Sequence, residues 1–322
     1  MTLAIGSLAL PSPYVLAPMA SLTDVAFRTL LAEIGGVGLL ITEMVSAEGL
    51  LRRNRKTFQM MRGSGVDTPV FIQLFGESAD AMARAAGIVA DETDFDGIDI
   101  NMGCPAGKVI RKGAGAALMK NPAAAAKIVA AVRRAVPGLP LSVKMRLGFD
   151  RVIAADFLEA IQNEGADAVF VHFRLQCQRY RVAADWSHAQ ELRRIARVPL
   201  VGNGDVLTVE DARRRLEEVD GVMIGRGAVM DPLIFHRLTA GNGNDDLESR
   251  VIPRLLELIQ LHYTEPLRLG RLKALTRFLV SGRRMSRRYR QAIYSATTFE
   301  QGARNLLALA DRIIDAGGAA ER

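Results

Sequence analysis

The segment "DGIDINMGCP" (residues 96–105) places a cysteine directly after a short apolar run. Residues 97–103 are apolar and rich in Ile, which is typical of a strand buried on both faces of a parallel sheet. Cys104 follows between a glycine and a proline, and the chain has only one other cysteine, Cys177. A thiol at the exit of a buried strand is therefore a candidate for chemistry.

Eight runs of this kind occur before residue 230. They span residues 14–19, 38–44, 70–76, 97–103, 141–147, 168–174, 199–205 and 221–227. Ala-rich helical patterns lie between them, for example at residues 80–93 and 122–136, and the second opens on Asn121 and Pro122 as capping and first-turn residues. Strands that alternate with helices predict right-handed βαβ units and a parallel sheet.

The placement of polar residues favours a closed barrel over a doubly wound open sheet. Eight βα units in about 225 residues match the size of a (β/α)8 TIM barrel. Polar or special side chains close nearly every run, and in a barrel all these ends meet on one face, where active sites are built. They are Met19, Glu43, Gln73, Asn101, Lys144, Arg146, His172, Arg174, Asn203, Asp205 and Arg226. We therefore predict a TIM barrel over residues 1–240.

The rest of the chain has a different composition. After the polar linker "GNGNDDLESR" (241–250), residues 250–322 show amphipathic helical patterns and no convincing strand. We predict a small, basic, all-helical domain there. Ten cations lie in residues 251–290 against Glu257 and Glu265, so the net charge of +7 is uneven. The cations are Arg254, Arg268, Arg271, Lys273, Arg277, Arg283, Arg284, Arg287, Arg288 and Arg290. Such a block indicates either a polyanionic partner or a solvated helix face, and charge alone favours neither.

The overall composition, 49% hydrophobic and 24% charged over 322 residues, is that of a globular protein with a sizeable core. No apolar run is long enough to span a bilayer, and the N-terminus lacks the features of a signal peptide. Cysteine and histidine residues do not cluster at metal-ligand spacings. We therefore expect a cytoplasmic protein with reduced thiols, no membrane partner and no metal, whereas the oligomeric state is not indicated.

Glycine-rich turns follow the last two runs, as "GNGD" (202–205) and "IGRGA" (224–228). In TIM barrels these loops often bind phosphate, because glycine lets backbone N–H groups approach an anion closely. Arg226 can add a charge-assisted contact. The alternative is that the glycines only make tight turns, but two such turns in these positions favour phosphate.

Four further side chains are candidates for the site. Lys144 needs an anionic partner inside a strand, either a flavin that becomes anionic on reduction or, as the alternative, a Schiff base. Gln73 can bond a heterocycle edge or nearby backbone, and His172 can meet a ring carbonyl or a phosphate. Cys104 is either a proton donor or nucleophile at the barrel mouth or a small buried filler.

Together these segments resemble the tRNA-dihydrouridine synthase family, flavoenzymes that reduce a uridine in RNA to 5,6-dihydrouridine. The motifs follow in the family's order and spacing over nearly the whole chain, and a basic helical domain after the barrel is also the family arrangement. They are "LAPMASLTDVAFR", "TEMVSA", "QLFG", "DINMGCPAGKVIRKGAGAALMKNP", "VKMRLG", "ADW", "GNGD" and "MIGRGA".

The resemblance implies FMN as the cofactor of the barrel, NADPH as its reductant and tRNA as the partner of the C-terminal helices. Hydride would pass from flavin N5 to C6 of a uracil pulled out of its stack, and Cys104 would give a proton to C5. The substrate would be bound by Asn101, Arg174, Tyr180 and Lys273. FMN would be held by Pro18, Met19, Ala20, Gln73, Lys144, His172, Asn203, Gly204, Asp205, Gly225 and Arg226.

Two places depart from the family pattern. In "HFRLQCQRYRVAADW" (172–186), Phe173, Leu175 and Val182 stand where the family has glycine, threonine and glycine. We expect these bulkier residues to reshape or stiffen a loop at the barrel mouth. Phe278 stands where a tryptophan is common.

Two other classes of function compete with this interpretation. An FMN-dependent reductase of free pyrimidines or small enones, similar to dihydroorotate dehydrogenases, would share the barrel but does not require a basic helical domain. A non-enzymatic RNA-binding protein would use that domain, but it has no need for Cys104, Lys144 and His172 on one face.

Overall fold

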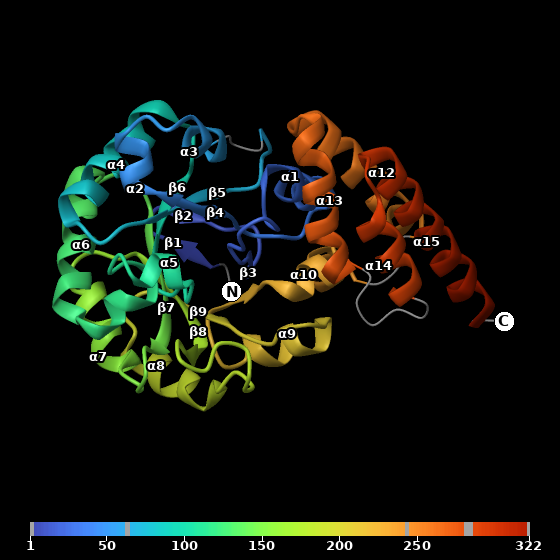
Figure 1. The fold of residues 1–322 in the computed structure, drawn as a ribbon. Helices are drawn as coiled ribbons and strands as arrows, with labels where there is room; N and C mark the ends of the chain where they lie inside the picture. Colours follow the sequence, from blue (N-terminus) through green and yellow to red (C-terminus); the bar gives the residue numbers. More distant parts are fainter. Residues whose placement is uncertain (1–2, 62–64, 242–244, 280–285, 321–322) are drawn as a thin grey trace.

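The chain folds into a closed barrel of parallel strands with a helical domain on one side (Figure 1). The structure, a computed structural model, describes residues 3–61, 65–241, 245–279 and 286–320. The barrel strands are β3 (Tyr14–Leu16), β4 (Leu40–Ser46), β5 (Val70–Phe75), β6 (Gly97–Asn101), β7 (Leu141–Gly148), β8 (Ala168–Leu175), β9 (Leu200–Asn203) and β10 (Gly221–Ile224). Neighbouring strands pair in chain order, β10 pairs with β3, and a bridge between Val15 and Leu39 closes the ring.

Helices cover the outside of the barrel, as predicted. Asn121 accepts a hydrogen bond from the backbone N–H of Ala124 at 3.1 Å, and Pro122 takes the first helical position. The helices are α1 (Val25–Ile34), α2 (Ala47–Leu51), α3 (Arg55–Met60), α4 (Ala79–Glu92), α5 (Gly107–Ile110), α6 (Pro122–Ala135), α7 (Ala154–Gln162), α8 (Ala189–Ile195), α9 (Val209–Leu216), α10 (Arg226–Met230) and α11 (Ile234–Ala240), with short 3-10 helices η1 (Gly115–Lys120) and η2 (Trp186–His188).

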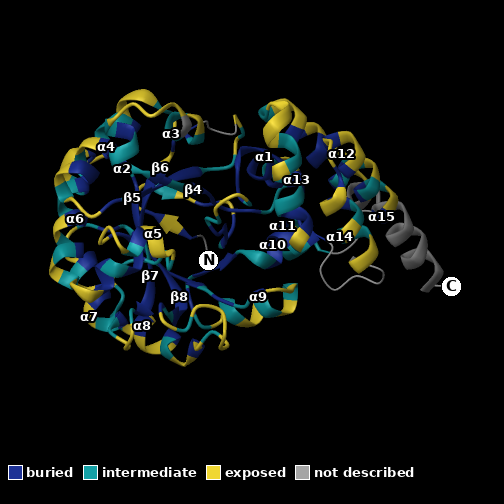
Figure 2. Cartoon of the chain, in the orientation of Figure 1, coloured by how far each residue is buried: buried dark blue, intermediate teal, exposed yellow. Residues whose placement is uncertain are grey.

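Two apolar cores lie on the two sides of the sheet. The outer core packs the sheet against the helices. The inner core fills the barrel toward the end at which the strands begin, with fully buried side chains such as Phe71, Phe170 and Val201. Figure 2 shows the strands dark and the outer helix faces exposed. Because successive side chains of a strand point to opposite faces, each strand contributes to both cores.

A short N-terminal hairpin was not predicted. Strands β1 (Ala4–Ile5) and β2 (Leu8–Ala9) pair antiparallel, and the buried residues Leu3, Ile5 and Leu10 join the inner core. A Cβ on Gly221, at the start of β10, would lie 2.7 Å from the Leu3 side chain. The hairpin therefore closes the end of the barrel at which the strands begin.

The C-terminal residues form helices, as predicted. They are α12 (Asp245–His262), α13 (Glu265–Leu279), α14 (Ser286–Ser295) and α15 (Phe299–Ala320). Helix α12 packs on α1 and α13 on α10 (Figure 1). Arg254 of α12 makes two hydrogen bonds to the carboxylate of Glu33 in α1, at 2.7 and 2.8 Å. The helical part is thus fastened to the barrel wall.

The proposed boundaries, residues 1–240 for the barrel and 250–322 for the helical domain, stay a prediction. Two of the ten cations, Arg283 and Arg284, lie outside the described residues. Among the described residues, no helix is long and apolar enough to cross a membrane.

A buried cluster of charges lies between the two parts. Asp24, which caps α1, and Glu43 in the middle of β4 both face Arg271 of α13, at 3.4 and 3.6 Å, and Arg271 also covers the ring of Tyr263. Arg28 is 2% exposed and donates to the carbonyl of Thr23 at 2.8 Å. Burial raises the pKa of both carboxyls and lowers the pKa of Arg28, because each charge has left water.

Removing the guanidinium of Arg271 should therefore destabilise the protein. In Arg271→Met, the two buried carboxylates lose a partner, and we expect the free energy of unfolding in urea to fall by about 3 kcal/mol. The control is Arg277→Met, an exposed position on the same helix, which should change it by less than about 0.5 kcal/mol. Equal stability of the two variants would show that the cluster does not fasten the domain.

Candidate active site

The strand ends bring most of the predicted site residues to one end of the barrel, here called the mouth. Strand register pairs Asn101 with Lys144, and it pairs His172 with both Arg146 and Asn203. These inward-facing residues therefore lie side by side around the ring, above the apolar inner core.

Lys144 is the cation at the base of the mouth. Its Nζ lies 3.3 Å from Oδ1 of Asn203, whose Nδ2 donates to the carbonyl of Met223 at 2.8 Å. Burial, together with the charge of Arg146, lowers the pKa of Lys144 to about 8, while Asp99 acts in the opposite direction. Lys144 is thus mostly an ammonium at neutral pH, with one long contact that leaves donors for a ligand.

Cys104 lies half-buried on the loop after β6. Its backbone N–H donates to Oδ1 of Asn101 at 2.9 Å, and the guanidinium Nε of Arg146 donates to the carbonyl of Gly103 at 2.6 Å. Burial raises the pKa of the thiol, although the N–H of Ala106 and the charge of Arg146 oppose the shift. Cys104 therefore holds its proton at neutral pH, which suits a proton donor better than a thiolate nucleophile.

A series of charged side chains from the ends of β8, β9 and β10 lines another side of the mouth. Arg174 and Arg226 share the carboxylate of Asp205, with Arg226 Nη2 at 2.8 Å. Arg174 also donates to Nε2 of His172 at 3.1 Å. Burial and then the surrounding cations, beginning with Arg146, lower the pKa of His172 well below its usual value. His172 is therefore a neutral imidazole with Nε2 as acceptor, so its proton is on Nδ1.

Tyr180 is 60% exposed above these arginines. Its ring lies 5.7 Å from the guanidinium carbon of Arg174 and 5.0 Å from that of Arg226, within the range of cation–π attraction. A flat aromatic side chain thus borders the mouth on its solvent side.

The loop between β3 and α1 carries Pro18, Met19 and Ala20 to the same end of the barrel. The N–H of Met19 donates to Oγ1 of Thr23 at 2.8 Å. A Cβ on Gly225 would lie 3.3 Å from the sulfur of Met19. This loop and the last glycine turn are therefore close neighbours.

The residues of the mouth fit the expected flavin and its phosphate. On the side of the mouth formed by the ends of β6 to β10, two carboxyls, Asp99 and Asp205, oppose four cations, so an anion is favoured there. The cations are Lys144, Arg146, Arg174 and Arg226. Gly204 has φ +135°, and a Cβ there would lie 2.7 Å from Ala184 and 3.3 Å from the ring of His172. Only glycine lets the backbone come this close to the wall of the mouth.

Phe173 does not line the mouth, whereas its effect on the stiffness of the loop stays a prediction. Phe173 alternates with His172 and Arg174, so it points out of the barrel, where it is fully buried against Trp186 at 4.4 Å between ring centroids. Leu175 packs beside Gly148, and Val182, 45% exposed, contributes its carbonyl to Arg174. The large side chain therefore adds to the outer core.

Some site residues lie elsewhere or were missed. Lys273 lies on α13, where its Nζ donates to the carbonyl of Ala296 at 2.8 Å. Arg146 was noted as a strand end without a role, yet it holds the Cys104 loop. Asp99 was not considered, although a carboxyl two residues before Asn101 in an apolar strand signals a shared inward face.

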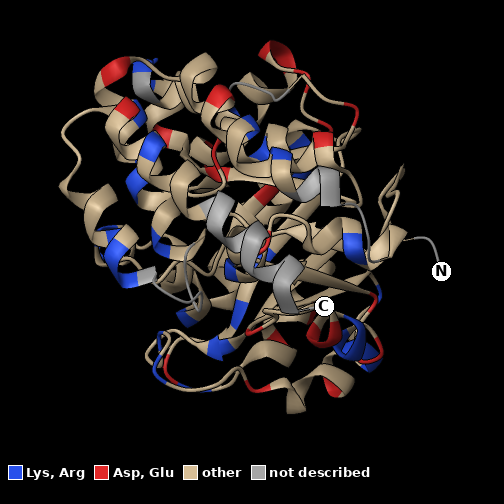
Figure 3. Ribbon diagram, turned by 90° about the vertical axis from the view of Figure 1, so that its right-hand side faces the viewer, with Lys and Arg blue, Asp and Glu red and all other residues tan. Residues whose placement is uncertain are grey.

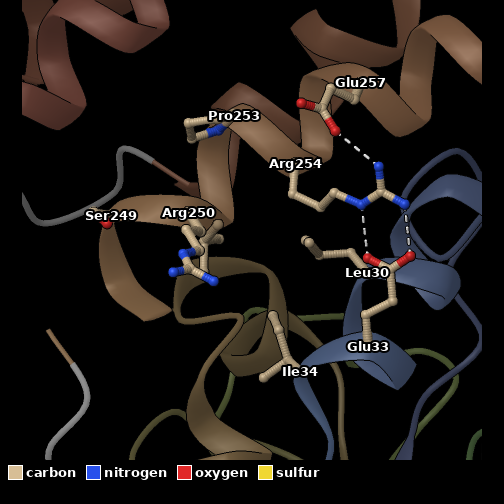
Figure 4. A pocket seen from close by; sticks show the side chains of 9 residues that line it. Leu30, Glu33, Ile34, Ser249, Arg250, Pro253, Arg254 and Glu257 are labelled. Atoms are coloured by element: carbon tan, nitrogen blue, oxygen red, sulfur yellow. Dashed lines mark hydrogen bonds and ion pairs between the residues drawn. The ribbon is translucent and has the colours of Figure 1, made fainter. Parts of the chain in front are cut away.

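A cavity of about 400 Å³ lies away from the mouth, between α1 and α12 (Figure 4). Glu33, Arg254 and Glu257 line it, and none of the predicted site residues does. In the described part of the chain, no group of three His, Cys, Asp or Glu side chains could hold a metal ion.

The comparisons with known proteins agree with this geometry. The model of the dihydrouridine synthase (Dus) family matches residues 15–313. The chain belongs to the dihydrouridine synthase family. It is 38% identical over 276 residues to a probable tRNA-dihydrouridine synthase of Mycobacterium tuberculosis, covering 81% of this chain and 71% of that one. A protein of the same description from Rhodobacter capsulatus is 42% identical over 247 residues, covering 74% and 75%.

Solved structures show the same fold at low identity. A morphinone reductase in complex with tetrahydroNAD aligns with a TM-score of 0.51 and 12% identity, over 76% of this chain and 91% of the other. The old yellow enzyme homologue from Zymomonas mobilis gives 0.51 and 12%, over 75% and 92%. At this low identity the likeness shows the fold alone.

The protonated state of Cys104 gives a direct prediction. In a Cys177→Ser variant, which leaves Cys104 as the only thiol, the rate of alkylation by iodoacetamide should rise with pH to a midpoint above the ordinary value of 9.0. The reason is that only the thiolate reacts, and burial disfavours it. A midpoint near neutral pH would contradict the assignment of Cys104 as an acid.

Proposed function

We propose that this chain reduces the C5–C6 double bond of a uridine in tRNA and so forms 5,6-dihydrouridine. The observation that carries the proposal is the half-buried thiol of Cys104, whose loop is held by Asn101 beside a cationic barrel mouth, in a member of the dihydrouridine synthase family. The curated relatives carry the corresponding name.

The cofactor is FMN, and NADPH is its reductant. FMN supplies the hydride that adds to C6 of uracil. Lys144 of β7 offers its ammonium to the ring, and Gln73 of β5, two strands away, offers its amide. Arg226 with the backbone at Gly204 and Gly225 is suited to the phosphate. The other residues assigned to the cofactor are Pro18, Met19, Ala20, His172, Asn203 and Asp205.

Cys104 completes the reduction by donating its proton to C5 of uracil. The carbanion-like product of hydride addition takes that proton, and the thiolate left behind is stabilised by the N–H of Ala106 and the charge of Arg146. Asn101 and Arg146 hold the loop through its backbone, so the thiol is positioned before the substrate arrives. Tyr180 and Arg174 border the path to the thiol.

The helical domain provides the contacts with tRNA. Four of its cations are already engaged within the protein, since Arg254, Arg268, Arg271 and Lys273 bond to side chains or carbonyls. Arg277, Arg287 and Arg288 are exposed. Figure 3, which looks onto this domain, shows Lys and Arg along its helices with Asp and Glu between them. We assign the phosphate contacts to the exposed cations.

The function is tested by the dihydrouridine content of tRNA, measured by mass spectrometry. The wild-type chain, expressed in a host that lacks its own synthases, should form dihydrouridine. Cys104→Ala should lower the rate constant with purified enzyme by about 10²–10⁴-fold, because a positioned acid contributes that much. The variant should still bind FMN. A wild-type protein that binds FMN but forms no dihydrouridine would favour a small-molecule reductase instead.

The RNA assignment predicts a change in salt dependence. Arg287→Ala with Arg288→Ala should reduce the slope of log affinity for tRNA against log salt by about two, one for each lost phosphate contact. The control is Arg84→Ala, an exposed cation on α4 of the barrel, which should leave the slope unchanged. An unchanged slope in the double variant would place the RNA elsewhere.

A further inference from the structure

A line of buried polar side chains leads from the barrel interior to the backbone of the Cys104 loop. Asp99 accepts from Oγ of Ser142 at 2.7 Å and from Nε2 of Gln73 at 2.6 Å. Nδ2 of Asn101 donates to Oε1 of Gln73 at 2.7 Å, and Oδ1 of Asn101 accepts the N–H of Cys104 at 2.9 Å. The line thus has a carboxylate at one end and the thiol loop at the other.

Strand register builds this line. The backbone of Asp99 in β6 is level with Gln73 in β5 on one side and with Ser142 in β7 on the other. Asn101 follows two residues later on the same inward face. Three adjacent strands therefore place the four side chains in contact.

The direction of every hydrogen bond is set by the two ends. A backbone N–H can only donate, so Asn101 must turn its oxygen to Cys104 and its amide nitrogen to Gln73. Gln73 then accepts with Oε1 and must donate with Nε2. That donor needs an acceptor, and the carboxylate of Asp99 provides one.

Asp99 is an energetically unfavourable residue at its buried position. It is fully buried, and burial raises its pKa to about 7, although bonds from Gln73 and Ser142 and the charge of Lys144 oppose the shift. An apolar residue would fill the space without the cost of removing a carboxyl from water. The hydrogen bonds that Asp99 makes give it a use that an apolar side chain would lack.

We propose that Asp99 is the positioning residue of the site. Its carboxylate fixes the orientation of the Gln73 amide and, through Gln73 and Asn101, the backbone that carries the Cys104 thiol. The inference rests on the proposed function, which assigns Gln73 to the cofactor and Cys104 to proton donation.

The proposal distinguishes two substitutions of similar size. Asp99→Asn can keep its oxygen toward Gln73 and turn its amide nitrogen to the hydroxyl of Ser142, which also accepts. The line then survives without the charge. Asp99→Leu has no acceptor, so Nε2 of Gln73 is left unpaired and both amides are free to turn.

Two measurements that require no RNA test this difference. In the Cys177→Ser background, the first is the rate and pH dependence of Cys104 alkylation without flavin, and the second is the dissociation constant of FMN. Asp99→Leu should change the alkylation rate and weaken FMN binding by about tenfold each, as the loss of one buried hydrogen bond predicts. Asp99→Asn should stay within about threefold of the parent in both.

Ser142→Ala is the matched control. It removes the other hydrogen bond of Asp99 but leaves the line to Cys104 complete, so it should behave like Asp99→Asn. If Asp99→Leu does not fold, Gln73→Leu replaces it, since breaking the line in the middle should change Cys104 alkylation in the same way.

The proposal is overturned if the leucine variant that folds shows the alkylation profile of the parent, or if Asp99→Asn is as impaired as Asp99→Leu. The outcome is separable from the proposed function. Alkylation and FMN binding that follow the expected order, in a protein that makes no dihydrouridine, would keep the positioning role and reject the reaction.

Discussion

The alternation of side chains along strands that close into a ring is the constraint on which the rest of the structure depends. In β8, Phe170, His172 and Arg174 follow one another up the inner wall. Phe170 belongs to the inner core, and the two polar residues lie above it. The same order, apolar below and polar above, recurs in β5 with Phe71 and Gln73. The polar groups of the mouth therefore lie directly above a layer of apolar side chains. Solvent screens their charges poorly there, so the charges interact strongly at short range.

Much of the fold can be predicted from local sequence patterns. Most of the contacts that build the site cannot, because they join residues far apart in the sequence. The eight strands, the helix from Pro122 and the position of Cys104 at a strand end are visible as short apolar runs and their terminal residues. The hairpin was missed because its two-residue strands carry no periodic signal. The outward direction of Phe173 follows from its alternation with His172, but its partner Trp186 could not be read from the sequence.

Contacts between distant segments could not be read from the chain. Nothing local indicates that Asp99 lies level with Gln73 and Ser142, since this depends on strand register. The count of C-terminal cations likewise does not show that Arg271 is committed to Asp24 and Glu43. Glu43 also accepts the N–H of Ser21, a residue with φ +64° in the loop assigned to the cofactor. The carboxylate of Glu43 thus contacts both that loop and the helical domain. It therefore helps to fix the position of the domain relative to the mouth.

The hairpin that closes the other end of the barrel limits how molecules can reach the site. With Leu3, Ile5 and Leu10 packed into the inner core, the interior offers no passage through that end. In the proposed function, the tRNA and the reductant of the flavin must therefore both reach the site through the mouth. Because the two share one opening, we expect the reduction of the flavin and the reduction of the uridine to occur in separate binding events.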